Sequence, residues 1–326
     1  MTAAEIIRRV REIQVRTGRQ VADVLAGEYV SVFKGGGIEF EEVRPYVPGD
    51  DVRTIDWNVT ARTGEPFVKR FVEERQLTLL LMADISASQD FGSASRSKRE
   101  AAAELCALLA FSAIRNDDKV GLVLFHGDVE QYIPPRKGQK HALRVVREVL
   151  AHGELTSDTD APAPAVVPGL REAIRRILPT AARRLRRAHQ ATDIARAMRF
   201  AMSVTRRRAV CFVVSDFLDE AYERALTTAN QKHDVIAVLV TDPREIEIPA
   251  VGLVALEDAE TGRTRLYDTG SAAFRRTAGE LAARRVADLE KRFRRAGIDF
   301  IHIDASGSVV EPIVRFFKMR ERRMRR

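Results

Sequence analysis

Three oxygen-bearing side chains follow a predicted buried strand at alternating positions. Asp84, Ser86 and Ser88 come directly after the apolar run 77–83. Because alternate residues of an extended segment share one side, a loop at the end of this strand can direct one carboxylate and two hydroxyls at one point. Mg²⁺ prefers near-octahedral oxygen coordination and usually keeps several waters. The spacing indicates a site for Mg²⁺, or for Mn²⁺ or Ca²⁺, although Ser and Asp after a strand often only cap a helix or form a turn.

Two later segments repeat this placement of oxygen ligands where structural elements meet. Thr192 precedes the helical pattern 194–202, and Asp216 follows the apolar strand 209–214. The combined pattern resembles the metal-ion-dependent adhesion site of von Willebrand factor type A domains, which uses Asp-x-Ser-x-Ser, a distant Thr and a distant Asp. The resemblance implies that one ion is bound by Asp84, Ser86, Ser88, Thr192 and Asp216.

A second resemblance lies upstream of these ligands. Residues 37–51 read Gly-Ile-Glu-Phe-Glu-Glu-Val-Arg-Pro-Tyr-Val-Pro-Gly-Asp-Asp and continue into 52–57 and then Ala61-Arg62. This stretch is similar to the signature of domain-of-unknown-function family 58, bacterial proteins whose second half is type A-like. Over roughly residues 30–240, the resemblance implies a Rossmann-like type A domain. It also implies association with a MoxR-type AAA+ ATPase.

From Gln76 onward, predicted strands alternate with predicted helices. Continuous apolar runs such as 79–82 are typical of parallel strands that are buried on both faces. We therefore expect an α/β fold, a Rossmann-like doubly wound sheet of the von Willebrand factor type A-like kind. In such sheets, ligands bind beyond the carboxyl ends of the strands, where Asp84 and Asp216 fall. The predicted strands are 77–84, 119–125, 129–133, 209–215, 234–240, 252–257, 263–267 and 298–303, and the helices are 97–115, 139–151, 192–205, 220–230 and 271–296.

The chain divides into three predicted parts. Residues 1–76 form a small helical and β-rich subdomain, 77–305 the type A-like domain, and 306–326 a basic C-terminal helix or tail. An insertion at about 152–190 begins with Pro- and Ala-rich chain that reads as a semi-rigid linker. Because the insertion leads directly into Thr192, we expect a lid or docking arm beside the site.

Within the leading part, helical patterns cover 2–16 and 21–25, and hydrophobic alternation follows. The alternation predicts short strands around 40–46, 52–57 and 67–71, separated by turns. Trp57, the one tryptophan of the sequence, is expected to take part in a buried polar contact with neighbouring charged residues.

Charge is unevenly distributed along the 326 residues, which carry a net charge of +8. Residues 171–208 contain 12 Arg against two acidic residues, and 315–326 contain seven basic residues against Glu321. Such basic islands suit docking to an acidic protein surface, nucleic acid or anionic lipid. Solvated helix faces and a frayed tail explain them equally well.

The cysteines and the apolar runs bear on compartment. Cys106 and Cys211 lie in apolar patterns, so they read as core residues in a reducing environment. No apolar run approaches the roughly 20 residues of a membrane-spanning helix, and the first residues lack the order of a secretion signal. We expect a cytoplasmic protein.

Three functions compete for this sequence. The ligand set without a separate base or nucleophile favours a protein-binding module, not an enzyme, whose bound ion captures a carboxylate of a partner. That partner would be a MoxR-type ATPase or one of its clients. Metal-dependent phosphoester hydrolysis would need a base beyond the aspartates assigned to the ion. Nucleic-acid binding by the Arg islands lacks interleaved aromatic residues for stacking.

Overall fold

The computed structural model of the chain describes residues 37–74, 76–93, 96–155, 192–219, 221–257 and 264–324. The chain forms two compact units, one comprising Phe33–Leu77 and the other containing Thr78–Arg326. The predicted helices at 2–16 and 21–25 lie outside the described residues, as do residues 156–190 of the predicted insertion.

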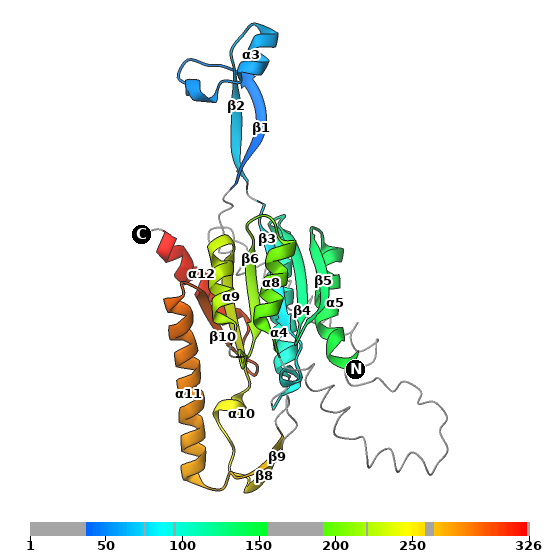
Figure 1. Cartoon of the computed structure of the whole chain (residues 1–326), viewed down its shortest axis with the longest axis vertical. Helices are drawn as coiled ribbons and strands as arrows, with labels where there is room; N and C mark the ends of the chain where they lie inside the picture. Colours follow the sequence, from blue (N-terminus) through cyan, green and yellow to red (C-terminus); the bar gives the residue numbers. More distant parts are fainter. Residues whose placement is uncertain are drawn as a thin grey trace, which may run out of the picture. The chain divides into compact units, whose positions relative to one another are not determined.

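A mostly parallel sheet forms the centre of the larger unit (Figure 1). Its strand order in the described chain is β10-β7-β6-β3-β4-β5, and every neighbouring pair is parallel except β4 and β5. The central strands are buried on both faces, which is why their sequences are continuous apolar runs. The strands are β3 (Thr78–Asp84), β4 (Lys119–Phe125), β5 (Val129–Arg136), β6 (Val210–Ser215), β7 (Asp234–Thr241) and β10 (Asp299–Asp304).

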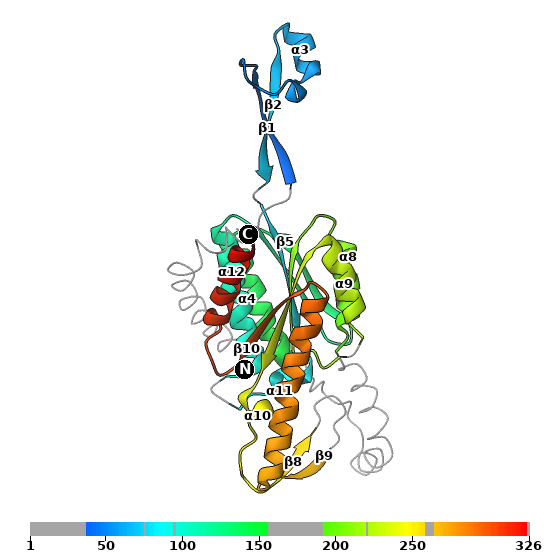
Figure 2. The same cartoon turned by 90° about the vertical axis from the view of Figure 1, so that its left-hand side faces the viewer.

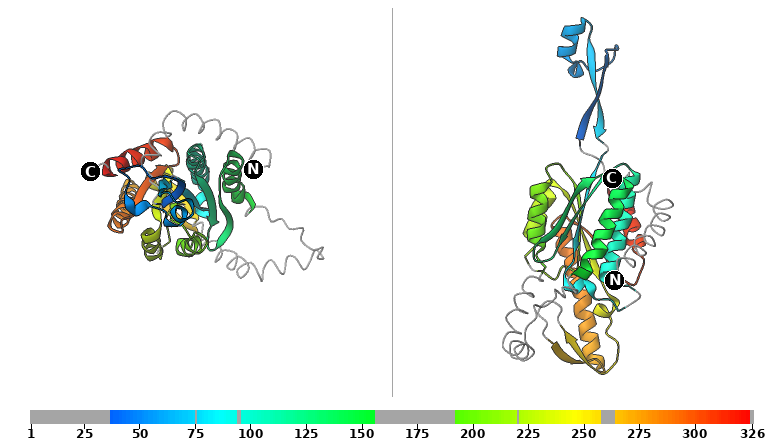
Figure 3. Two further views of the ribbon diagram at one scale, coloured as in Figure 1. Left: turned by 90° about the horizontal axis from the view of Figure 1, so that it is seen from above. Right: turned by 90° about the vertical axis from the view of Figure 1, so that its right-hand side faces the viewer.

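Helices cover both faces of this sheet (Figures 2 and 3). One face carries α4 (Lys98–Arg115), α5 (Gln139–Leu155) and α12 (Val310–Met324), and the other α8 (Ile194–Val204), α9 (Glu223–Lys232) and α11 (Ala272–Arg295). The predicted doubly wound α/β fold of the von Willebrand factor type A-like kind is confirmed by this arrangement. No described helix is long and apolar enough to cross a bilayer.

Helix α4 is the most deeply buried of these helices. Its Ala- and Leu-rich sequence is apolar on nearly all sides, as expected for a helix enclosed by neighbours. Ser97 and Glu100 form a capping box at its start. Cys106 lies on this helix and Cys211 on β6, and burial raises the pKa of both thiols to about 12. Their predicted role as core residues is confirmed.

The chain between β7 and α11 forms a small appendage of the larger unit. It contains α10 (Pro243–Ile246) and an antiparallel pair of strands, β8 (Leu253–Glu257) and β9 (Thr264–Asp268). The strands predicted at 252–257 and 263–267 agree with these bounds within one residue.

The basic C-terminal segment is a helix whose arginines form ion pairs with residues of the sheet. On α12, a guanidinium nitrogen of Arg320 lies 2.5 Å from a carboxylate oxygen of Asp234, and one of Arg323 lies 2.9 Å from Asp299. Part of this basic island is therefore neutralised within the chain, which leaves less positive charge for nucleic acid.

The smaller unit differs from the three short strands predicted for it. Two antiparallel strands, β1 (Gly37–Pro45) and β2 (Phe67–Glu74), flank a single turn of 3-10 helix, η2 (Val52–Thr54), and the helix α3 (Trp57–Thr63). The predicted strand at 52–57 is wrong. The reason is local, because Asp51 and Asp56 cap η2 and α3 by accepting hydrogen bonds from following backbone N–H groups.

Trp57 is exposed, so the predicted buried polar contact is also wrong. Trp57 is the first residue of α3 and is 69% exposed. The neighbouring carboxylate of Asp56 caps the helix instead and lies 3.3 Å from the ammonium of Lys69.

Candidate functional site

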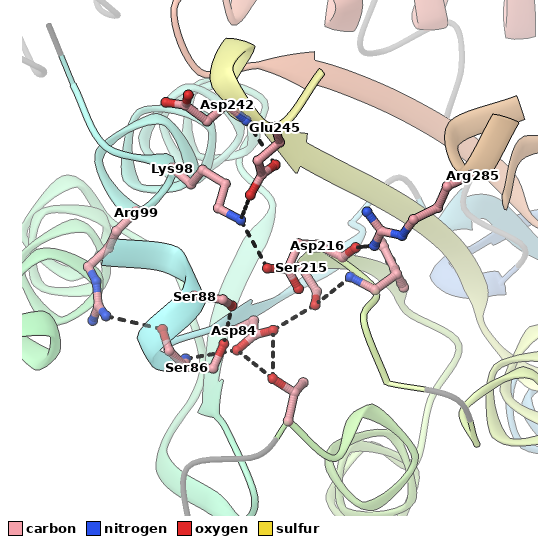
Figure 4. Close-up of polar contacts among 12 residues, drawn as sticks. Asp84, Ser86, Ser88, Lys98, Arg99, Ser215, Asp216, Asp242, Glu245 and Arg285 are labelled. Atoms are coloured by element: carbon pink, nitrogen blue, oxygen red, sulfur yellow. Dashed lines mark hydrogen bonds and ion pairs between the residues drawn. The ribbon is translucent and has the colours of Figure 1, made fainter. Parts of the chain in front are cut away.

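The Asp84 loop turns sharply at the carboxyl end of β3. The backbone N–H of Ser86 donates to Asp84 Oδ1 at 2.9 Å, and the hydroxyls of Ser86 and Ser88 lie 3.0 Å apart (Figure 4). The N–H of Ile85 donates to the carbonyl of Phe125 at 2.9 Å, which ties the loop to the end of β4. All three predicted ligands in this loop are buried and gathered into one cluster.

Thr192 comes to this cluster from the start of α8. Its hydroxyl lies 3.3 Å from Asp84 Oδ2, although the two residues are 108 positions apart in the sequence. The N–H of Asp193 donates to the carbonyl of His126 at 2.8 Å, so the segment before α8 is fixed to the chain that follows β4.

Asp193 itself is the N-cap of α8. Its carboxylate accepts from the N–H of Arg196 at 2.7 Å. We expect Asp193→Ala to lower the free energy of unfolding by about 1 kcal/mol, the usual cost of losing a cap. Urea unfolding measures this cost. Asp193→Asn, which retains a capping oxygen, is the matched control, and an equal loss in both variants would contradict a capping role.

The end of β6 supplies the remaining oxygens. The hydroxyl of Ser215 donates to Asp84 Oδ2 at 2.6 Å and accepts from the N–H of Phe217 at 3.1 Å. Next to it, Asp216 is 1% exposed. Asp216 Oδ2 accepts from Lys98, whereas the buried Oδ1 has no hydrogen-bond partner within the described part of the chain.

Backbone strain accompanies Asp216. Phe217 has a φ of 53°, in the left-handed region that bulky residues rarely adopt. Its ring is buried and lies 5.1 Å from the ring of Phe293 and 5.4 Å from that of Tyr222, measured between centroids. Strained residues of this kind persist where the surrounding packing enforces them, and they concentrate at functional sites. The aromatic contacts thus hold the backbone that follows β6, and with it the position of Asp216.

Two basic residues in the first turn of α4 contact the Asp84 loop and Asp216 at the end of β6. The ammonium of Lys98 lies 3.0 Å from Asp216 Oδ2 and 2.6 Å from Glu245 Oε1 (Figure 4). The guanidinium of Arg99 donates to the carbonyl of Ile85 at 3.3 Å.

The electrostatics of the site are dominated by burial. Burial, together with the charge of Asp216, raises the pKa of Asp84 to about 6, although hydrogen bonds from Ser215 and Ser86 act to lower it. For Lys98, burial acts to lower the pKa, but the carboxylates of Asp216 and Glu245 outweigh it and the pKa is raised. The site therefore holds a charged lysine beside two close carboxylates.

The structure places all five sequence-predicted ligands at the same edge of the sheet. Asp84, Ser86, Ser88 and Thr192 are linked by short contacts, and Asp216 influences Asp84 through its charge. Within the described residues, no three His, Cys, Asp or Glu side chains form a group that could hold a metal ion. A metal here would depend on hydroxyls as well as on two carboxylates.

Sequence reasoning missed Ser215, Lys98, Arg99 and Glu245. One signal was available for Lys98. A lysine in the first turn of a helix faces the positive end of the helix dipole, which is unfavourable, and such a position calls for a specific partner.

The sheet order and the Asp84 loop define the larger unit as an α/β domain of the von Willebrand factor type A-like kind. The chain belongs to the family described as "Protein of unknown function DUF58", which matches residues 42–288. The resemblance seen in the upstream signature is thereby confirmed at the level of the family.

The chain is similar to mycobacterial proteins over most of its length. Uncharacterized proteins of Mycobacterium tuberculosis and Mycobacterium bovis are each 31% identical over 314 residues, covering 96% of this chain and 89% of theirs. Among solved structures, the conserved hypothetical protein BatB from Bacteroides thetaiotaomicron has a TM-score of 0.40 at 17% identity, covering 76% of this chain and 99% of its own. The SpRpn10 VWA domain has a TM-score of 0.36 at 12% identity, covering 73% and 93%.

Proposed function

We propose that this chain is a metal-dependent protein-binding module. The side chains that would hold Mg²⁺, or Mn²⁺ or Ca²⁺ in its place, directly or through water, are Asp84, Ser86, Ser88, Thr192 and Asp216. When bound, the ion would offer an open coordination position to a carboxylate oxygen of a partner protein.

One observation carries this proposal. Asp216 Oδ1 is buried without a hydrogen-bond partner in the described chain, next to a cluster of oxygen atoms from two other segments. An unpaired buried carboxylate oxygen is costly unless a cation or donor satisfies it. The donor set fits a hard cation, because it consists of carboxylate and hydroxyl oxygens and includes no soft ligand.

The chain's own residues prepare the site. Ser215 and the N–H of Ser86 orient the Asp84 carboxylate, and Arg99 fixes the backbone of its loop. The Asp84 loop and the end of β6 need little rearrangement for binding, since contacts with neighbouring strand ends and with α4 already hold them.

Binding is favoured over turnover. An enzyme would need a base or nucleophile beside the ion, and the three carboxylates described in the site are already assigned to the ion, as Asp84 and Asp216, or paired with Lys98, as Glu245. From the family resemblance, we propose a MoxR-type AAA+ ATPase or its client as the partner.

The partnership can be tested with a purified MoxR-type ATPase from the same organism, without nucleotide. With the full chain immobilised, we expect biolayer interferometry to show binding in Mg²⁺ that weakens at least tenfold on adding EDTA. Asp216→Asn should weaken it similarly in Mg²⁺. Asp304→Asn is the matched control, because Asp304 ends the edge strand β10, two strands away from β6, and within the described chain its carboxylate accepts from the N–H and the hydroxyl of Ser306. Binding that is insensitive to EDTA would reject the metal-dependent mechanism.

A further inference from the structure

The position of Lys98 is unusual for a lysine in two respects. Its side chain is 1% exposed, although lysine is almost never fully buried without a dedicated partner. It is also the first residue of α4 after the Ser97 cap, where the helix dipole disfavours a positive charge. Neither burial nor local helix structure explains a cation at this position, so the explanation must lie in what its ammonium group contacts.

The ammonium contacts one oxygen of a proposed metal ligand. It bonds to Asp216 Oδ2 at 3.0 Å and to Glu245 Oε1 at 2.6 Å, while Oδ1 of the same Asp216 carboxylate has no hydrogen-bond partner among the described residues. We infer that Lys98 is a built-in cation of this site, which shares Asp216 with the divalent ion and weakens the binding of that ion. This inference rests on the proposed function.

The charges explain why such a residue would be useful. Asp84, Asp216 and Glu245 together carry three negative charges, and Lys98 offsets one of them. With a divalent ion added, the group is neutral, whereas without the lysine it would keep a net negative charge. Because like charges repel most strongly where water is excluded, a negative group would repel the partner's carboxylate. Lys98 thus lowers affinity for the ion and preserves the attraction of the ion for a partner.

Calorimetric titration of the full chain with MgCl₂ tests this inference. We expect Lys98→Met to bind Mg²⁺ roughly tenfold more tightly than the wild type, because the repulsion between ammonium and ion is removed. Lys291→Met removes an exposed lysine whose side chain is 66% exposed and should leave the affinity unchanged. Glu245→Gln removes a negative charge from a partly exposed position and should weaken binding severalfold.

Removing one partner of a buried ion pair can unfold a protein, so a second readout is needed. If Lys98→Met is unstable, thermal melts with MgCl₂ and with NaCl at equal ionic strength should show a larger Mg²⁺-dependent rise in Tm than in the wild type. An equal rise would overturn the inference, and so would unchanged Mg²⁺ affinity in Glu245→Gln.

The outcomes separate this inference from the proposed function. Mg²⁺ binding to the wild type with equal affinity in Lys98→Met overturns the inference alone. Binding to Lys98→Met but not to the wild type would mean that Lys98 takes the place of the ion in the native chain, which overturns both the shared use of Asp216 and the metal-dependent function. Absence of binding in both overturns both.

Discussion

Asp84→Asn is expected to abolish Mg²⁺ binding to the full chain. Asp84 lies at the centre of the cluster, since Ser86, Thr192 and Ser215 all approach its carboxylate. The change removes a negative ligand while keeping the size of the side chain. Losing a residue that merely supports a metal ligand typically costs 10- to 100-fold in affinity, so losing a carboxylate ligand should cost about 100-fold or more. Isothermal titration calorimetry at pH 7.5 measures this loss.

The control for this variant is a carboxylate at the same edge of the sheet. Asp304→Asn alters the residue at the end of β10 and should bind Mg²⁺ as the wild type does. Circular dichroism should show that both variants keep the wild-type fold. Equal Mg²⁺ affinity in the wild type and Asp84→Asn would remove the proposed site altogether.

The fold of the larger unit was readable because its sequence signals were strong and consistent. Parallel strands buried on both faces need long apolar runs, and each run ends at a polar residue such as Asp84. Helices α4 and α11 begin at serine caps that mark their boundaries within one residue of prediction. Local signals and tertiary packing agree in this part of the chain.

The smaller unit was read less well, because the apolar residues between its two strands do not line the face of a third strand. Val52 is 61% exposed and Trp57 is 69% exposed, so the apolar pattern did not report burial. The capping carboxylates of Asp51 and Asp56 were the more informative residues, since they start helical turns that interrupt any strand.

The candidate site was only partly predictable for a related reason. Asp84, Ser86 and Ser88 are close in sequence, and strand-end placement brought Asp216 to the same edge. Lys98 and Glu245 are 147 positions apart in the sequence, and their pairing is a product of tertiary packing. Spacing along a chain carries no signal for such a contact.

In metal-free protein, acidification from pH 8 to pH 5 is expected to stabilise the wild type relative to Asp84→Asn. Burial and the charge of Asp216 raise the pKa of Asp84 from the ordinary 3.8 to about 6. Between these two pKa values Asp84 keeps its proton in the folded state but has released it in the unfolded state. The contribution of this proton to the free energy of unfolding therefore falls as pH rises through the window and is absent above it. Across the whole window the shift corresponds to about 3 kcal/mol, of which roughly 1 kcal/mol is gained between pH 7 and pH 5.

Urea unfolding in EDTA at pH 5, 6, 7 and 8 measures this effect as the difference between wild type and Asp84→Asn. The comparison cancels the groups that do not interact with Asp84, because the two chains differ at one side chain only. Excess Mg²⁺ should remove the pH dependence in the wild type, since a cation at Asp84 stabilises the ionised carboxylate and lowers its pKa. Parallel pH profiles of the two proteins in EDTA would show that the pKa of Asp84 is not raised in the folded state.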